Sequence, residues 1–258
     1  MKNRHGKIGR VSILFAALAL VGGEAAAAGL AVKPLAAGLG YDYLSRTVVW
    51  SGDIADSKLT SNMLSARAEF GLAKGVIVGL TAGFSFSDVS GLVFDDLPIS
   101  LLYDGSAIPG LVLGADVLVP IKKLGDFEMK ATGRIVYSSG MSKTWPLEGF
   151  AVEGEAEGKP GWMEVAVGPR LDYLFFGRVV PYIELTGRWL TARFRMSETL
   201  GELAGEEKRR VSGDFAVGAA VGADGEVSRR LLVRGKIGIL PFAGGVDTVA
   251  TVGVLYRF

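Results

Sequence analysis

The last thirteen residues, Val246 to Phe258, read Val-Asp-Thr-Val-Ala-Thr-Val-Gly-Val-Leu-Tyr-Arg-Phe. Every second residue from the terminus belongs to one apolar row, and the alternate row is smaller and more polar. Because successive side chains of a β-strand point to opposite faces, this pattern predicts a two-faced strand that ends on an aromatic residue. The apolar row consists of Phe258, Tyr256, Val254, Val252 and Ala250.

The rest of the chain repeats this kind of segment. Alternating stretches of about ten residues or slightly more are each closed by a turn, a spacing typical of a β-barrel or sandwich. No stretch after the first thirty residues is apolar for the ~18 residues that a membrane-spanning helix needs. The predicted strands are 38–50, 63–72, 76–86, 111–119, 127–137, 162–175, 182–195, 211–222, 229–240 and 246–258.

A targeting segment precedes the first strand. Four basic residues flank an apolar core from Val11 to Val21, and Ala26-Ala27-Ala28 offers a small-residue cleavage site. The apolar core is too short for a transmembrane anchor of ~20 residues, so the pattern predicts a secretory signal peptide. We expect residues 1–28 to be removed and residues 29–258 to form a single domain.

Composition excludes several classes of protein. The chain has 28 basic and 27 acidic residues, and loss of the signal removes four of the former and one of the latter, leaving a net charge of −2. That balance does not indicate nucleic-acid binding. There is no cysteine, and the single histidine, His5, lies in the signal. Disulfides, thiolate metal sites and histidine-dependent catalysis are therefore not expected.

The connections between the predicted strands alternate in length. Short ones lie at 73–75, 120–126, 176–181 and 223–226, where Asp224-Gly225 is a hairpin signal. The longer set is 51–62, 87–110, 138–161 and 196–210, followed by the short 241–245. Residues 98–103 have strand-like character inside a long loop, and either extend the following strand or form a hairpin outside the membrane. A count of eight or twelve strands stays open beside the preferred ten.

The C-terminal strand resembles that of bacterial outer-membrane β-barrels, in which a terminal phenylalanine and an aromatic residue two positions earlier form the assembly signal. The matching residues here are Val254, Tyr256 and Phe258. The resemblance is to small barrels of the opacity type or of ten strands, and identifies no subfamily. It implies an all-β, antiparallel, up-and-down transmembrane β-barrel in the outer membrane, with both termini periplasmic. The implied partners are outer-membrane lipid and lipopolysaccharide, with periplasmic chaperones and the barrel-assembly machinery during biogenesis, and the expected state is a monomer.

The two rows of each strand differ in chemistry. One row is large and apolar, and its aromatic residues lie mainly toward the strand ends, as expected of a lipid-facing wall. The other row mixes charges with very small residues, which suit a narrow lumen where side chains from all strands converge. The polar row is therefore assigned to the inside. A secreted lipocalin-like barrel with the apolar row inside is the alternative.

The inward row carries nearly equal numbers of acids and bases. Charges in a narrow lumen are partly desolvated and must be paired, and arginine can hold two carboxylates. Balanced charge favours a salt-bridged plug over a channel for ions or small solutes, which usually shows one dominant sign. The predicted network comprises Arg46, Arg67, Glu69, Glu128, Arg134, Glu164, Arg170, Asp172, Glu184, Arg188, Asp214, Arg230, Arg234, Lys236 and Asp247, with Asp42, Asp116, Lys130 and Arg257 on the same row.

Two further groups of charged residues lie outside the inward row. Asp95-Asp96 could be read as paired carboxylates or calcium ligands, but a solvated acidic loop is the simpler interpretation. Arg193 and Arg195 fall on the outward row, near Lys208 to Arg210, and could hold lipopolysaccharide phosphates. The preferred interpretation is that the strand ends before Arg193 and that these are solvated loop charges paired with nearby glutamates. No catalytic residue, metal site or cofactor is predicted. A structural or surface-interaction role is favoured over a narrow channel.

Overall fold

The computed structural model describes residues 33–51, 56–103, 106–149, 152–242 and 245–258. The predicted signal peptide lies outside these residues. Within them, no helix is long and apolar enough to cross a membrane. The strands are β1 Lys33–Val48, β2 Ser57–Gly71, β3 Ile77–Ser90, β4 Leu92–Phe94, β5 Leu101–Tyr103, β6 Ile108–Leu124, β7 Phe127–Gly140, β8 Lys143–Pro146, β9 Gly154–Tyr173, β10 Val179–Leu200, β11 Leu203–Glu226, β12 Leu231–Phe242 and β13 Gly245–Arg257, with a 3-10 turn at Ala73–Gly75.

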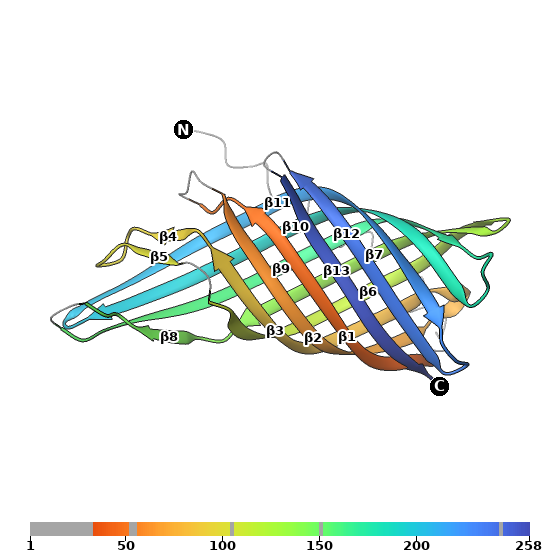
Figure 1. Ribbon diagram of the computed structural model, residues 1–258, viewed down its shortest axis with the longest axis horizontal. Coiled ribbons are helices and arrows are strands. Elements are labelled where there is room, and N and C mark those ends of the chain that lie inside the picture. Colours follow the sequence, from red (N-terminus) through yellow and green to blue (C-terminus); the bar gives the residue numbers. More distant parts are fainter. Residues whose placement is uncertain (1–32, 52–55, 104–105, 150–151, 243–244) are drawn as a thin grey trace.

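Ten of these strands close into an antiparallel barrel, in the order β1-β2-β3-β6-β7-β9-β10-β11-β12-β13 and back to β1 (Figure 1). The C-terminal strand closes the ring, since β13 pairs with β1 from Ala36 opposite Arg257 to Ser45 opposite Thr248. The prediction of an all-β, antiparallel, up-and-down barrel of ten strands is confirmed. The ring has the preferred number of ten strands because β4, β5 and β8 lie outside it.

The two ends of the barrel differ. One end holds the start of β1, the end of β13 and the four short connections that follow β2, β6, β9 and β11; we call it the turn end. The opposite end, which we call the loop end, carries β4, β5, β8 and the long tips of β9, β10 and β11 (Figure 1).

The strands at the loop end reach further than predicted. The segment 196–210, expected to be a long loop, is a hairpin in which β10 and β11 are joined at Gly201 and Glu202. Gly201 has φ +60, a left-handed conformation that glycine adopts without a steric penalty. The prediction that the strand ends before Arg193 is therefore wrong. Alternation continues there because apolar residues still face inward at Phe194 and Met196.

The end of β11 also departs from prediction. Asp224-Gly225 was expected to form a turn, but β11 runs to Glu226, and residues 227–230 make the turn instead. Backbone N–H groups of Arg230 and Leu231 donate to the Ser228 hydroxyl, at 3.3 and 3.1 Å, and hold that turn closed. The hairpin signal at Asp-Gly is thus overridden by pairing of both residues with β10 and β12.

A β-bulge interrupts β11 in the middle of its length. Leu190 pairs with Asp214, whereas Ala192 pairs with Val211, so β11 has two residues, Ser212 and Gly213, opposite the single residue Thr191 of β10. Gly213 has φ +71 at this point. A bulge shifts the alternation of the strand it interrupts. Ser212, predicted to face inward with Asp214, is consequently exposed.

Of the two predicted alternatives for residues 98–103, the structure shows the hairpin. β5 pairs with β4 in a separate two-stranded sheet, with Leu92 opposite Tyr103 and Phe94 opposite Leu101. The alternative, in which this segment extends the following barrel strand, is wrong. Leu92 and Phe94 are fully buried, so the hairpin folds onto the barrel and does not stand free in solvent.

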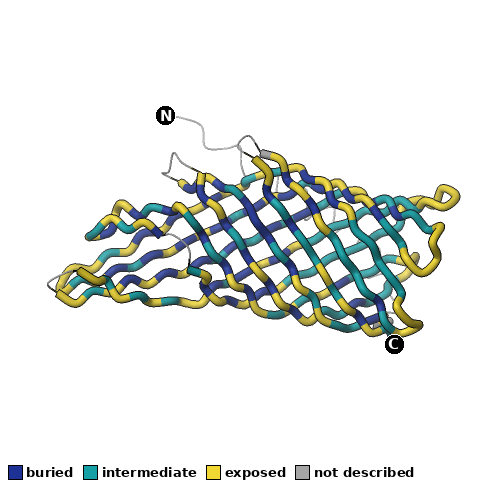
Figure 2. Tube along the Cα trace, viewed as in Figure 1, coloured by how far each residue is buried: buried dark blue, intermediate teal, exposed yellow. Residues whose placement is uncertain are grey.

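Burial alternates along β9 and β10 and along the loop-end parts of β6 and β7, whose turn-end parts are intermediate or exposed (Figure 2). The predicted lipid-facing row is exposed, as at Leu80, Phe84 and Ile237, while the intervening residues turn inward. A lipocalin-like barrel would hide that row in its lumen, so the soluble alternative is wrong. The exposed apolar wall is the surface that a bilayer would cover.

Candidate functional site: the barrel lumen

The inward row changes chemistry along the barrel axis, and β10 shows the change most clearly. From the turn end it presents Glu184, Thr186 and Arg188 inward, followed by apolar residues from Leu190 to Met196. The lumen therefore has a charged half at the turn end and a mainly apolar half at the loop end, where the buried hydroxyls of Ser61 and Ser87 and of Ser85 and Ser138 pair with each other. We call the two parts the charged half and the apolar half.

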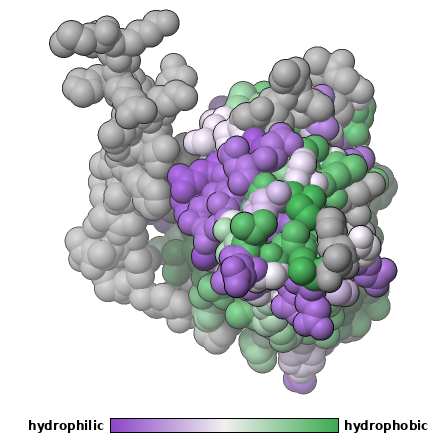
Figure 3. Space-filling model, turned by 90° about the vertical axis from the view of Figure 1, so that its left-hand side faces the viewer, coloured by the Kyte–Doolittle hydropathy of each residue, from purple (hydrophilic) through white to green (hydrophobic). Residues whose placement is uncertain are grey.

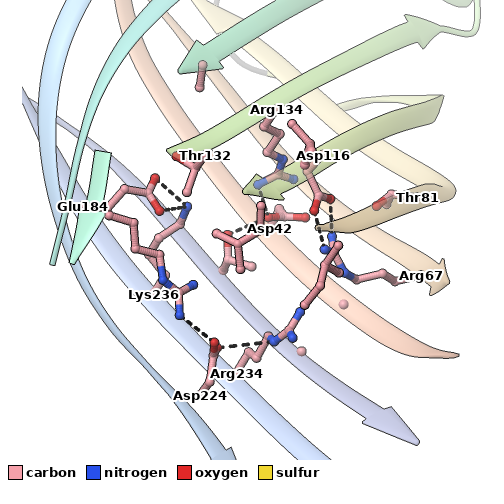
Figure 4. A pocket seen from close by; sticks show the side chains of 18 of the residues that line it. Asp42, Arg67, Thr81, Asp116, Thr132, Arg134, Glu184, Asp224, Arg234 and Lys236 are labelled. Carbon is pink, nitrogen blue, oxygen red and sulfur yellow. Dashed lines mark hydrogen bonds and ion pairs between the residues drawn. The ribbon is translucent and has the colours of Figure 1, made fainter. Parts of the chain in front are cut away.

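In the charged half, the guanidinium of Arg67 makes a two-point contact with Asp116, with both N–H···O distances 2.6 Å (Figure 4). The same side chain donates from Nε to Glu69 at 2.9 Å. Glu69 also contacts Arg234, whose Nε lies 3.3 Å from Asp224. These contacts join β2, β6, β11 and β12 across the lumen. Such two-carboxylate contacts suit the planar fork of arginine.

Arg170 extends this series of contacts to β9 and β10. It donates to Asp172 at 2.5 Å and to Asp224 at 2.7 Å. Its guanidinium lies 3.5 Å from the ring centre of Tyr182, a cation–π contact on the neighbouring strand. Lys130 reaches Asp172 at 2.7 Å and Glu128 at 2.9 Å, nearer the turn end.

A second group of contacts lies deeper in the barrel. Asp42 accepts from Arg134 at 2.9 Å and from the hydroxyl of Thr251 at 2.6 Å. Lys236 donates to Glu184 at 3.2 Å. Figure 4 shows both pairs pointing into the same space as the Arg67 and Arg234 pairs. Every cation of this group thus has a carboxylate within contact distance.

Arg46 lies at the boundary of the charged half that is nearer the loop end. Its side chain is 1% exposed and contacts three carboxylates, Glu164 at 3.4 Å, Asp247 at 3.9 Å, and Asp214. Glu164 is shared with Arg188 at 2.6 Å. One buried cation therefore balances carboxylates from three strands, the arrangement in which removal of a single partner is most costly.

Of the fifteen residues predicted for the network, the structure brings fourteen to the lumen or its turn-end mouth. Arg230 is the exception: it is exposed in the turn before β12, donates to the Tyr256 hydroxyl at 2.8 Å, and lies outside the lumen. It was misplaced because the predicted strand began at residue 229, whereas β12 begins at Leu231. The prediction also missed Asp224, because a turn was assigned to it. The inward parity running from Asp214 to Gly222 is the signal that identifies it.

The charged half encloses a cavity of about 150 Å³. Its lining includes Asp42, Arg134, Asp116, Lys236 and Tyr182. Several of these side chains keep part of their surface accessible, for example 26% for Arg134. The cavity leaves room for water among these charges, and water there would lower the cost of holding so many charges inside.

The apolar half closes the lumen above this cavity. Its side chains come from the barrel strands and from the β4–β5 hairpin, and the ring of Phe94 lies 5.5 Å from that of Phe194. The most buried members are 0–2% exposed, so water is excluded there. They are Trp50, Leu59, Leu92, Phe94, Ile108, Phe194, Leu190 and Leu240.

Two buried carboxylates dock the hairpin loop onto the barrel wall. Glu207 accepts from the backbone N–H of Asp96 at 2.7 Å, and Glu198 accepts from that of Ile99 at 3.2 Å. Arg209 contacts both Glu207 and Asp95. Asp95 and Asp96 thus belong to this docked loop. Among the described residues no group of acidic side chains has the arrangement of a metal site.

On β10 the outer wall changes chemistry at the same level as the lumen, in the opposite sense. On β10 the outward residues are apolar from Ile183 to Trp189 and polar or charged from Thr191 onward. Trp189 and Phe215 form an aromatic pair at the border, with ring centres 4.8 Å apart. The apolar stretch from Pro181 to Trp189 matches the ~9–11 residues of a transmembrane β-strand. Just beyond that border β10 is apolar inside, from Leu190 to Met196, and polar outside, as a strand of a water-soluble β-structure is.

The sequence matches no protein-family model and no curated protein. Among solved structures, the outer membrane protease OmpT from Escherichia coli is similar over 89% of this chain and 96% of its own, with 10% identity and a TM-score of 0.50. This chain therefore has the fold of an outer-membrane β-barrel. The translocator domain of the autotransporter NalP from Neisseria meningitidis is similar over 95% of this chain and 97% of its own, with 14% identity and a TM-score of 0.49. At these identities the likeness concerns the fold alone.

Proposed function

We propose that this barrel resides in the bacterial outer membrane as a closed anchor, and that its working surface is the β-structured part beyond the loop-end aromatic border. We call that part the head; it comprises 154–162 of β9, 192–200 of β10, 203–211 of β11, and the β4–β5 and β8 segments. Both termini lie on the periplasmic side in this proposal, and the head faces outward from the cell. The role is structural or one of surface interaction.

The observation that carries the proposal is the closed apolar half of the lumen. A path for ions needs a continuous series of polar groups or water along the axis. Here Trp50, Leu190 and Leu240 are buried at 2% exposure or less, directly beyond the charged tier of Arg46. Ions entering the turn-end cavity would meet a packed, dry core.

The head offers a surface suited to interaction. Seen from the loop end, hydrophilic side chains gather beside an apolar area (Figure 3). β9, β10 and β11 run continuously from the barrel wall into the head, so that part is held rigidly on the anchor. Rigid elements position contact residues more accurately than mobile loops do. The chain's single histidine is His5, and we propose no catalytic role.

A narrow channel is the alternative function, and recording across planar lipid bilayers separates the two. The folded barrel should give no steady, resolvable conductance. A steady conductance in the unmutated protein would mean that the apolar half opens, and the channel would replace the closed anchor.

For assembly, we propose the barrel-assembly machinery and periplasmic chaperones as transient partners that recognise the outward row at the end of β13. Val254 and Tyr256 are each 44% exposed, and Phe258 is 77% exposed. The Phe258 backbone N–H donates to the Leu35 carbonyl at 3.2 Å, beside the β1–β13 closure. Removal of Phe258 should lower the amount of heat-modifiable, folded protein in outer membranes. Unchanged amounts would count against this role, and Arg257→Gln serves as a matched neighbour.

A further inference from the structure

A group of exposed cations lies on the outer wall just beyond the aromatic border. In the register of the strands, Arg193 of β10 faces Arg210 of β11, and one step further Arg195 faces Lys208. On the other side of β10, Arg195 faces Lys159 of β9. All five side chains are exposed and point outward. We call this group the outer basic site.

The arrangement costs folding free energy when nothing is bound to it. Residues directly opposite in antiparallel strands have Cβ atoms about 4.5–5.5 Å apart, and like charges at such positions are destabilising. Here two consecutive cross-strand pairs are cationic, and a third strand adds another cation to the second pair. In the lumen, by contrast, the facing cations Lys130 and Arg170 share a carboxylate, that of Asp172. An anion placed over the pairs would relieve the repulsion.

Local carboxylates neutralise only part of the group. Glu206 contacts both Arg195 and Lys208, and its contact with Lys208 is 2.5 Å. Hydrogen bonds from Lys208 and then from Arg195 hold the pKa of the Glu206 carboxyl below its usual value, so it stays ionised. Within the described part of the chain, no carboxylate contacts Arg193, Arg210 or Lys159. Three cations therefore remain for a ligand.

The level of the site on the barrel indicates the source of the anion. Arg193 lies four residues beyond Trp189 on the same strand, on the same outward row. At ~3.3 Å per residue and a tilt near 45°, that is roughly 9 Å above the aromatic border. Lipid headgroups lie at this height, and long arginine side chains can reach toward them.

We propose that the outer basic site binds the phosphate groups of an anionic membrane lipid headgroup, with Arg193 and Arg210 as the principal ligands and Lys159, Arg195 and Lys208 flanking them. The inference rests on the proposed bilayer location of the barrel. Guanidinium groups hold phosphate oxygens through two parallel N–H···O contacts, which suits a headgroup fixed at the membrane surface. In an outer membrane the ligand class is a phosphorylated glycolipid such as the lipid A part of lipopolysaccharide.

Native mass spectrometry of the folded barrel in detergent, titrated with bisphosphorylated lipid A, tests the proposal. The double variant Arg193→Gln with Arg210→Gln should bind roughly tenfold more weakly or worse, since each surface cation contributes several-fold. Arg178→Gln with Arg229→Gln removes two exposed charges at the turn end and should leave binding unchanged. Glu206→Gln should bind more tightly, because it frees Arg195 and Lys208.

Three results would overturn the site. The first is equal lipid A binding by the Arg193/Arg210 double variant and the unmutated barrel. The second is equally tight binding of dephosphorylated lipid A, which would point to the acyl chains. The third is displacement by inorganic pyrophosphate at the concentration of lipid A itself, which would indicate a site for free phosphates. Folding of the barrel into phosphatidylcholine vesicles, read by heat-modifiable migration, tests the bilayer location separately.

Discussion

The two halves of the lumen are built on the same strands and the same inward row, yet they are filled by opposite chemistry. In the charged half, arginines and carboxylates meet around a cavity, and Arg67 keeps 22% of its side chain accessible. In the apolar half, side chains such as Leu190 and Phe94 are fully buried. The change takes only one step along β10, from Arg188 to Leu190.

The outer wall explains this difference. Where the wall is apolar and faces lipid, the inside can hold polar groups, because the barrel needs no second hydrophobic surface to fold in a bilayer. Where the outside faces water, burial of apolar side chains is the main driving force, so the inside must become apolar. The exchange at Trp189 and Thr191 outside matches the exchange at Arg188 and Leu190 inside. Both faces of β10 therefore change chemistry at the level where the proposed membrane border lies.

The largest effect should come from Arg46, at the boundary between the halves. Arg46→Ala leaves Glu164, Asp214 and Asp247 without their shared cation, and should lower the free energy of unfolding by about 3–5 kcal/mol, as for other buried charges that lose a partner. Urea titration of barrels folded into lipid vesicles measures this loss. Arg46→Met, which keeps bulk and removes charge, should cost a similar amount. If Arg46→Met is as stable as the unmutated barrel, the stability contributed by Arg46 comes from packing and not from its charge.

The next effect, about 3 kcal/mol, is expected for Phe94→Ala in the apolar half. The ring is fully buried against Phe194, and its removal leaves a cavity between the hairpin and the barrel. Limited proteolysis should then cleave the β4–β5 hairpin faster, while the charged half stays intact. Leu102→Ala changes an exposed residue of the same hairpin and is the matched control. Equal cleavage of both variants would mean that the hairpin is not part of the core.

The sequence predicts the architecture well because two local signals, alternation and turn residues, repeat along the chain. Strand number, strand order and the lipid-facing row all follow from them. The inward parity also brings Arg46, Arg67 and Arg234 together with their carboxylates. The prediction of an Asp-Gly turn failed at Asp224 because a local preference is overruled when both neighbouring strands pair with the same residues.

Depth along the barrel could not be predicted in this way. Parity says which way a side chain points and says nothing of which residues from other strands share its level. Met63, Trp162 and Leu190 lie on the predicted inward row, but their convergence into one core depends on strand register and on the hairpin folding over them. The bulge beside Ser212 is a further limit, since it alters the parity of β11 without a strong sequence signal other than Gly213.

The smallest loss of stability is expected for Arg234→Ala. This variant tests whether the carboxylates of the charged half are each held by more than one cation. Arg234 contacts Glu69 and Asp224, but each of these carboxylates has a second cation, Arg67 at 2.9 Å and Arg170 at 2.7 Å. Arg234→Ala therefore leaves neither Glu69 nor Asp224 without a cation. Its side chain is also 24% exposed, so water can enter the space it leaves.

Arg234→Ala should therefore cost only about 1–2 kcal/mol, between the values for exposed and buried pairs. Vesicle unfolding titrations measure the loss, and Arg234→Ala combined with Arg67→Ala provides the contrast. The double variant removes both cations that contact Glu69, so it should cost more than the sum of the two single losses. Strict additivity would show that the carboxylates are solvated independently, and the charged half would then be a wet vestibule and not a coupled network. Bilayer recordings should stay silent for both variants, because the apolar half, and not Arg234, closes the lumen.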